Sequence, residues 1–549
     1  MNNTESLQHE FDGVRLEMDT YHEKMQFYLE AYQDNVYYKA KPNSPARDRV
    51  GVNLLQAFAD KNWYYVSPFP KISVPALPEN REGASKTEKF LYGLHDKNEN
   101  ELLWSKLTFD GTVMSAAVTI TDVDYKKRQI KHIRVDPRRA YWKTSDLEGS
   151  GIEVFWHALP MRKSKIKREF GVDVTNSKSL GTDFWREYDQ VSWRNNIHDD
   201  PYYMVITRID HETMTRWCGD QFLMTSHKHM LPCAPFDVKF PMELPGTEYR
   251  GDFFLRRLKD LQAEFNEQWR QRGNIVRKLG NPAVWGRNVN NNQLNDVKDG
   301  LSMDGGFIGL KENGELGILT IPETAMIDKS LIDIYSRMQD VAGFPPATFG
   351  AIAGANTSGD ALGVYFQPTT RQIDHQNKAY ARLLKNINVK SILLARHMLK
   401  TDETMSFESY GGRSSKVVVD GELANNEAAY TEVFSRADLV TTKNIVTCST
   451  VTPKDDIGYK RLMMEMARDG VLSKTTALDE MGFLSPQDEI DLLTAEQSNP
   501  QLNPDGMSKL LSANAQMTAA NNQQGVPANV GSDQLGGATG DLGGEVLSQ

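Results

Sequence analysis

Two apolar stripes at helical spacing constrain the fold of this chain more than any other feature of its sequence. In residues 252–272 and 325–341 the apolar side chains recur at steps of three or four, the period of one face of an α-helix. The stripes consist of Phe254, Leu258, Leu261, Phe265 and Trp269 in the first segment and of Ile327, Leu331, Ile334, Met338 and Val341 in the second. We therefore predict two long helices, either of which could by itself be an ordinary core helix.

The segment between these two helices, residues 280–322, is rich in glycine and asparagine. It contains short apolar runs that are typical of strands, and a turn signal at Glu312, Asn313 and Gly314. We predict a small β-rich excursion between the helices.

Residues 369–400 predict a third helix, roughly 45 Å long, with Pro368 in its first turn. The segment is strongly basic, because it contains seven basic residues and a single acid, Asp374, in a chain whose net charge is −10. The bases are Arg371, Lys378, Arg382, Lys385, Lys390, Arg396 and Lys400. Two interpretations remain open: a solvated helix face, or a surface that meets DNA or an acidic neighbouring subunit.

A glycine-rich stretch, GAIAGANTSGDALG at residues 350–363, precedes this helix. A phosphate-binding loop would need a lysine at the helix start, but Gly359 is followed by Asp360, whose carboxylate would repel a phosphate. The glycine spacing does not fit a dinucleotide fingerprint either. We interpret the stretch as a loop that ends in a capped helix, with Ser358 or Asp360 near the first turn.

The remaining parts of the chain predict mixed structure. Residues 1–44 contain an amphipathic helix, and residues 45–250 form an α+β region with an antiparallel tendency. From about residue 423 the chain reads as helical, with Ser473 placed to cap a short helix, and the composition of residues 498–549 predicts disorder. The strand candidates are residues 72–75, 112–123, 130–136, 152–159 and 202–210, and residues 161–171 predict a short basic helix.

The composition narrows the possible classes of protein. With 549 residues, 25% charged and 39% hydrophobic, the chain reads as a soluble protein of several domains. Its net charge of −10 argues against tight sequence-neutral binding of nucleic acid, which needs a cationic surface. Three cysteines are too few for a disulfide framework and fit a reducing compartment, and no apolar run predicts a membrane span or a signal peptide.

A search for catalytic or metal-binding patterns gives weak candidates. His227, His229 and Cys233 lie within seven residues. A zinc site usually needs a second, distant pair of ligands, however, and Cys218 alone does not provide one. The adjacent acids Asp199–Asp200 and Asp455–Asp456 fall in turn-like settings that favour capping. We therefore expect no catalytic residue, no metal and no cofactor, and we expect that the protein is not an enzyme.

The order of these segments resembles the portal proteins of tailed double-stranded DNA bacteriophages, over roughly residues 45–497. The stretches that carry the resemblance are PFPKISVP (68–75), IRVDPRRAYW (133–142), AGFPPATFG (342–350), TSGDAL (357–362) and the closing segment GVLSKTTALDEMGFLSPQDEIDLLTAEQ. No single one of them is as specific as a nucleotide-binding motif, so their order along the chain carries the argument.

The resemblance implies an α+β portal fold with wing, stem, clip and crown. The implied segments are an N-terminal helical segment (1–44), the wing (45–250), a stem helix (251–279), the clip (280–322), a second stem helix (323–341), a tunnel loop (342–360), a long wing helix with a β segment (361–422), a helical crown-like region (423–497) and a disordered tail (498–549).

The family's function would then be expected of this chain. Portal proteins form a homo-oligomeric ring, usually of about twelve subunits, at one capsid vertex, through which DNA is packaged and later ejected. The implied partners are the terminase large subunit, the major capsid or scaffold protein, a head-completion adaptor or tail protein, and double-stranded DNA, with no membrane. The implied location is the virion, after assembly in the host cytoplasm.

Three sets of candidate residues follow from the resemblance and from the charge pattern. The tunnel loop would face DNA with Gly350, Gly354, Asn356, Thr357, Ser358, Gly359 and Asp360, and the basic helix would present Arg371, Lys378, Arg382 and Lys385. The clip would dock partners through Trp285, Arg287, Phe307 and Lys311. Two alternatives remain, a terminase-like nucleic-acid enzyme and another virion structural protein such as a head-tail adaptor or capsid component.

Overall fold

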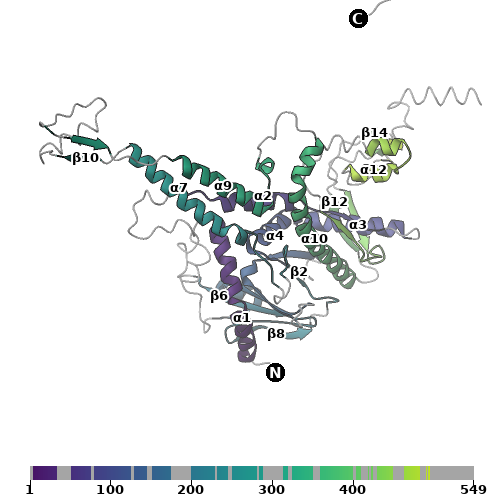
Figure 1. Cartoon of the computed structure of the whole chain (residues 1–549). Helices are drawn as coiled ribbons and strands as arrows, with labels where there is room; N and C mark the ends of the chain where they lie inside the picture. The colour runs from purple at the N-terminus through teal and green to yellow at the C-terminus, as the bar shows by residue number, and fades with distance from the viewer. Residues whose placement is uncertain are drawn as a thin grey trace, which may run out of the picture. The chain divides into compact units, whose positions relative to one another are not determined.

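A computed structural model of the chain (Figure 1) shows a mixture of helices and strands, which is compatible with the predicted α+β class without being specific to one fold family. By its internal contacts the chain divides into two compact units, residues 1–452 and residues 453–549. The residues that the structure describes are 4–33, 51–75, 80–124, 129–144, 151–174, 200–228, 231–244, 250–280, 284–287, 313, 315–318, 324–349, 359–399, 404–409, 418–419, 422–423, 430–448, 463–481, 490 and 493–494.

The first helix, α1 (Thr4–Tyr32), confirms the predicted amphipathic segment. Its buried positions follow one another at steps of three and four, so they form one stripe along the helix. This stripe packs against α2 (Leu54–Val66), α4 (Asn100–Met114) and strand β4 (Ala140–Thr144). Helix α1 therefore shares the hydrophobic core of the α+β region that follows it.

Two antiparallel sheets form the centre of the first unit and confirm the antiparallel tendency of residues 45–250. One sheet has the order β3-β2-β9, and the other runs β4-β5-β6-β7-β8 in chain order. Residues 112–114, which were expected to begin a strand, instead end helix α4, and Ser115, with a φ of +63°, separates this helix from the strand that begins at Ala117. The strands are β2 (Ala117–Asp124), β3 (Gln129–Val135), β5 (Ile152–Arg162), β6 (Tyr202–Ile209), β7 (Thr213–Cys218), β8 (Gln221–Lys228) and β9 (Phe236–Lys239).

Helices α3 (Arg81–Lys97) and α5 (Lys163–Phe170) belong to the same unit. Helix α3 contacts α4, and α5 is the short basic helix that the sequence predicts. At the start of α5, the backbone N–H and the hydroxyl of Ser164 both donate to the carboxylate of Asp200, at 2.9 and 2.6 Å. Asp200 therefore caps a helix from a distant part of the chain, as the turn-like setting of this acid suggested.

A helical hairpin follows the sheets. Helices α7 (Lys259–Gly280) and α9 (Ala325–Ala342) run alongside each other (Figure 1), and the side chain of Arg272 pairs with that of Asp328 between them. Between them in sequence, β10 (Val284–Arg287) and β11 (Glu315–Ile318) form an antiparallel pair, so the predicted β excursion is confirmed in these strands.

The start of the first hairpin helix differs from the prediction. Phe254 and Leu258 were expected on the same α-helical stripe as Leu261, but residues Phe254–Arg257 form a 3₁₀ turn, η4, and α7 begins at Lys259. The side chains of Phe253, Phe254, Leu255 and Leu258 are all buried, and short 3₁₀ turns of this kind are frequent at the N-termini of α-helices.

Helix α10 (Gly359–Met398) is the longest of the described elements, with forty residues, and it contains Pro368. The prediction that Pro368 lies in the first turn is therefore wrong, since the helix begins nine residues earlier. An interior proline removes one backbone hydrogen bond, and here this loss is accompanied by local anchoring: the Thr369 hydroxyl donates to the Gly343 carbonyl oxygen at 2.7 Å, and the Thr370 hydroxyl donates to the Phe366 carbonyl oxygen at 3.0 Å.

After α10 the first unit returns to strands. Strand β12 (Thr404–Ser409) pairs with β15 (Tyr430–Ser435), β13 (Val418–Val419) pairs with β14 (Glu422–Leu423), and β16 (Ile445–Thr447) pairs with β1 (Lys71–Ser73). The prediction of helix from residue 423 is therefore wrong for β15 and β16. Pairing with strands that are distant in sequence decides their structure, and local patterns do not report it.

In the second unit, α12 (Lys474–Glu480) confirms the short helix near Ser473. The Ser473 hydroxyl accepts a hydrogen bond from the backbone N–H of Thr476 at 3.1 Å, which is an N-cap contact. A preceding helical turn stops at Gly470, whose φ of +75° favours glycine. Among the described helices of the chain, none is long and apolar enough to cross a membrane.

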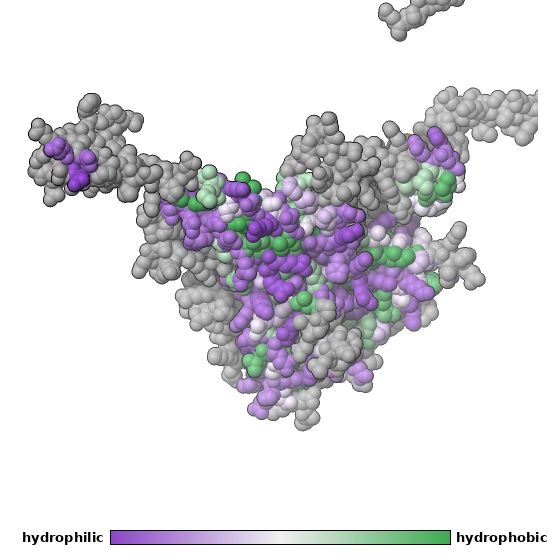
Figure 2. Space-filling model, viewed as in Figure 1, coloured by the Kyte–Doolittle hydropathy of each residue, from purple (hydrophilic) through white to green (hydrophobic). Residues whose placement is uncertain are grey.

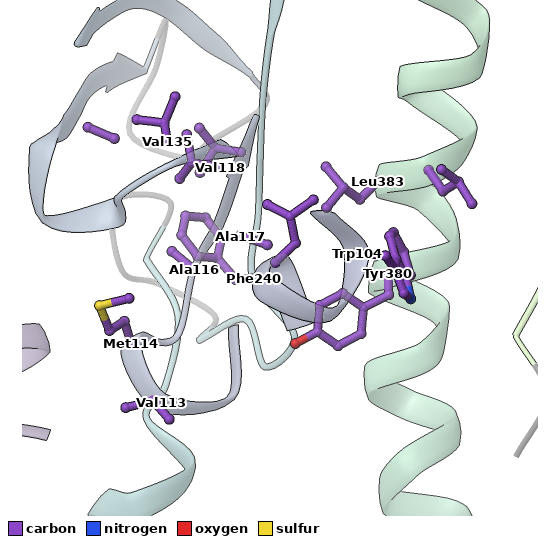
Figure 3. Packing of buried hydrophobic residues seen from close by; sticks show 14 of the residues in the cluster. Trp104, Val113, Met114, Ala116, Ala117, Val118, Val135, Phe240, Tyr380 and Leu383 are labelled. Atoms are coloured by element: carbon purple, nitrogen blue, oxygen red, sulfur yellow. The ribbon is translucent and has the colours of Figure 1, made fainter. Parts of the chain in front are cut away.

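Two glycines offer a matched test of the packing. A methyl group on Gly111 in α4 would lie 2.2 Å from the Tyr380 hydroxyl oxygen and 2.7 Å from Pro241, whereas one on Gly13 in α1 would meet no atom within 4 Å. Figure 3 shows Tyr380 of α10 beside Trp104 of α4, at a ring separation of 5.9 Å.

We predict that Gly111→Ala destabilises the protein by about 1–3 kcal/mol, because Tyr380 must move out of a packed core. The control Gly13→Ala should stabilise it by roughly 0.5–1 kcal/mol, since alanine is the better helix former at an open site. Thermal or urea unfolding of the two variants measures both. Equal stabilities would show that α4 and α10 do not approach each other this closely.

Candidate nucleic-acid interface

The four basic residues singled out on the long helix lie on one exposed face of α10. Arg371, Lys378, Arg382 and Lys385 are all exposed and follow one another at steps of 7, 4 and 3. At 100° per residue, these steps keep the four side chains within about 60° of the helix circumference, over roughly 21 Å of its length. We call these four residues the basic strip.

The basic strip stays outward because the opposite side of α10 is buried. Ile373, Tyr380, Leu383 and Ile387 are at most 2% exposed and pack in the main core. Figure 3 shows Tyr380 and Leu383 of α10 turned toward the residues of α4 and β2. Among the described residues, α10 contacts β9, β2, β3, α2 and β16, whereas the four side chains of the basic strip are exposed.

Buried amides fix the register of α10 against α2. The side chains of Asn62 and Gln376 exchange two hydrogen bonds, each 2.9 Å long, and Asn62 also donates to the Thr112 hydroxyl at 3.2 Å. All three side chains are buried. Because a buried amide without partners costs about 1–3 kcal/mol, a shifted helix would be penalised at this point.

A second buried network joins α3, α4, β3 and α10. The Asn100 amide lies next to Nδ1 of His95 and 2.7 Å from Nδ1 of His132. The Nε2 atoms of the two imidazoles lie 2.7 Å from the Asn388 side-chain oxygen and 2.8 Å from the Ser391 hydroxyl, respectively. If the Asn100 amide donates to both Nδ1 atoms, each imidazole donates from Nε2 and is neutral.

Burial lowers the pKa of both imidazoles in this network. The pKa of His95 falls to about 4, although its contact with Asn388 opposes the shift. The pKa of His132 falls well below its usual value through burial and, secondarily, through repulsion from His95. The sequence gives no sign of this network, because its histidines and asparagines lie singly on separate elements and form no pattern along the chain.

Two further bases of α10 do not belong to the basic strip. The Lys390 ammonium lies 2.7 Å from the carboxylate of Asp237 on β9, and Arg396 donates to the Leu439 carbonyl oxygen at 2.6 Å. Asp237 is buried, and burial raises its pKa while the Lys390 charge opposes that shift. Lys390 and Arg396 therefore serve contacts within the unit, and the strip ends at Lys385.

The stretch IRVDPRRAYW also has an internal role. The guanidinium of Arg134 on β3 forms two hydrogen bonds, 2.5 and 2.6 Å long, with the carboxylate of Asp110, which lies buried in α4. Burial raises the pKa of Asp110 to about 7, while Arg134 favours the charged form. Asp136 accepts hydrogen bonds from the backbone and the guanidinium of Arg138. These contacts connect the sheet to α4 and explain this part of the stretch without a ligand.

The other candidate residues are placed only in part. Gly359 and Asp360 form the first residues of α10, and Trp285 and Arg287 lie on β10, opposite Gly317 and Glu315 of β11. Arg287 is exposed. The remaining candidates lie outside the described residues: Gly350, Gly354, Asn356, Thr357, Ser358, Phe307 and Lys311.

The weak metal candidates are not brought together in the described part of the chain. Cys218 is buried on β7 and His227 lies on β8, while His229 is outside the described residues. Among described residues no group of three histidine, cysteine or acidic side chains could hold a metal ion. Comparison with known proteins gives no further assignment, because no protein-family model matches the chain and no curated protein matches it.

Two lysines of α10 test the division between the strip and the buried pair. We predict that Lys390→Met destabilises the protein by about 3 kcal/mol, because it leaves the buried Asp237 carboxylate with a hydrogen bond from Asn386 but without the positive charge that pairs with it. The matched substitution Lys378→Met should change stability by less than about 0.5 kcal/mol, since Lys378 is exposed. Unfolding midpoints measure both, and equal losses would contradict the assignment of Lys390 to an internal contact.

The histidine network predicts that the stability of the protein falls as the pH is lowered. Between pH 6.5 and about 4, the unfolded chain binds protons that the folded His95 does not, so stability is full above this window and is lost as the pH falls through it. For His95 alone the loss would reach roughly 3 kcal/mol at the lower end.

The measurement is the unfolding free energy at about pH 7.5 and about pH 5 for the protein and for His132→Asn. The variant should lose less stability between the two pH values, whatever its stability at neutral pH. His22 and His157, whose pKa values burial also lowers to about 4, remain in both proteins and cancel. Parallel pH profiles would contradict the prediction.

Proposed function

We propose that this chain is a portal protein of a tailed double-stranded DNA bacteriophage. One observation carries the proposal: the helical hairpin α7–α9 with the β10–β11 pair between its helices, followed by the short turn at Pro346–Phe349 and the forty-residue helix α10. This is the order of stem, clip, second stem and long wing helix in the family that the sequence resembles. The antiparallel α+β region before the hairpin would be the wing.

In this proposal the protein acts without catalysis. Copies of the chain form a ring at one capsid vertex, the terminase drives DNA through its centre, and head-completion or tail proteins attach later. The clip, with Trp285 and Arg287 on β10, would dock the terminase and then the adaptor. Residues 350–358 carry no charged side chain, which suits a loop that slides over a phosphate backbone without a salt-dependent grip.

Electron microscopy of the purified protein tests the assembly. We expect closed rings of roughly twelve subunits around a central hole, since head-to-tail contacts that close produce rings. Deletion of Ala353 to Thr357 should leave these rings intact and reduce DNA packaging or retention in particles.

The control is a variant that replaces the same five residues with glycine and serine, which keeps the length and the lack of charge of the segment and should package normally. Particles that package and retain full genomes with the deletion would refute the role of this segment. Compact dimers with ATPase activity would refute the portal function as a whole.

A further inference from the structure

The outward faces of α1 and α10 carry charges of opposite sign in the same spacing. On α1, Asp12, Asp19 and Glu23 are exposed at steps of 7 and 4. On α10, the first three residues of the basic strip, Arg371, Lys378 and Arg382, follow one another at the same steps. We call the three acids of α1 the acidic strip.

The reversed charges at the edges of the two strips follow the same register. Arg15 follows Asp12 by three positions, and Asp374 follows Arg371 by three positions, and both are exposed. Suppose that the two helices run parallel, with Asp12 and Arg371 at the same level along their axes. Arg15 then lies at the level of Asp374, Asp19 at the level of Lys378, and Glu23 at the level of Arg382. Within this window of the strip faces, each charge lies at the level of a charge of opposite sign.

Both strips lie on helices and face solvent. The opposite side of α1 is buried from Leu7 to Tyr28, as the opposite side of α10 is buried in the core. Leu16, between Asp12 and Asp19, is 77% exposed and would give the acidic strip an apolar contact. On the face shown in Figure 2, hydrophilic residues cover most of the described surface and apolar residues are scattered among them.

The two strips do not neutralise each other within one chain. In the part of the chain that the structure describes, Arg371, Lys378 and Arg382 form no ion pair, and no ion pair joins α1 to α10. A surface that is complementary to another surface of the same molecule, but does not meet it there, can be satisfied by a second copy.

We propose that the basic strip of α10 binds the acidic strip of α1 on a second copy of this chain, with the two helices side by side and parallel. Such a contact joins two different surfaces, so it repeats from copy to copy and can close into a ring. The inference rests on the proposed function, because a portal ring is the assembly that this contact would build. It names the neighbouring subunit, rather than DNA, as the partner of the basic strip.

The charges are expected to set register and specificity more than affinity. An exposed ion pair contributes only about 0–1 kcal/mol, but like charges at an interface are strongly unfavourable. Shifts of the register by three or four residues would place Arg15 or Asp374 at the level of a charge of its own sign. The apolar contact of Leu16 and the rest of the interface between subunits would supply most of the affinity.

Charge reversal provides the test. The first variant carries Arg371→Glu, Lys378→Glu and Arg382→Glu, and the second carries Asp12→Lys, Asp19→Lys and Glu23→Lys. Each variant alone meets like charges at the contact, so the protein concentration for half-maximal assembly at low salt should rise about tenfold or more. An equimolar mixture should assemble again, because copies of the two variants that alternate present opposite charges at every contact. Mass photometry measures the assembly.

A control with the same change in net charge as the first variant carries Lys106→Glu, Lys165→Glu and Arg168→Glu at exposed sites of α4 and α5. It should assemble like the unmodified protein, and circular dichroism melts should show that all variants are folded. Normal assembly of the first variant, or a mixture that fails to assemble, would overturn the inference. So would a first variant that assembles normally but retains less DNA, because the strip would then face nucleic acid.

The outcome also separates this inference from the proposed function. Rings that form from the unmodified protein and from both variants would keep the portal proposal and end the inference. Filaments or dimers that depend on both strips would keep the inference and end the portal proposal.

Discussion

The burial of one side of α10 is the interaction on which the rest of the first unit depends. This helix contacts strands of both the β3-β2-β9 sheet and the β1-β16 pair, as well as α2, so it connects segments that are far apart in sequence. Its buried side combines apolar residues with amides such as Gln376 and Asn388. Apolar contact provides most of the free energy of burial but tolerates sliding, whereas the hydrogen bonds of Gln376 and Asn388 form in one register only.

Buried charges add a second set of constraints around the same helix. Asp110 and Arg134 connect α4 to β3, and Asp237 and Lys390 connect β9 to α10. Such pairs contribute little net free energy, because desolvation offsets the attraction between the charges. Removing one partner is costly, however, and the pairs therefore act against alternative arrangements of these elements. Together with the amides, they hold the outward side of α10 in a defined orientation.

A fixed orientation matters for the proposed assembly. A ring of identical subunits requires that two different surfaces of each copy keep a constant angle, since errors would accumulate around the ring. The acidic strip of α1 and the basic strip of α10 lie on helices whose other sides are buried in one continuous core. The hairpin of α7 and α9, with its β10–β11 pair, is attached to the same unit and would carry the docking surface of the ring.

The sequence by itself determined the elements whose pattern is local: the stripe of α1, helix α9, the cap at Ser473, the charges of the basic strip and strands β1, β2, β3, β5 and β6, whereas β4, β7, β8 and β9 were not predicted. Only the tertiary structure decided that α10 continues through Pro368, that residues 254–257 form a 3₁₀ turn, and that β15 and β16 are strands. It also decided that Lys390 pairs with the buried carboxylate of Asp237, whereas Lys378 is exposed. The physical reason is that helical periodicity and capping act over a few residues, whereas strand pairing, burial of charge and the partners of His95 and His132 depend on residues brought together from distant parts of the chain.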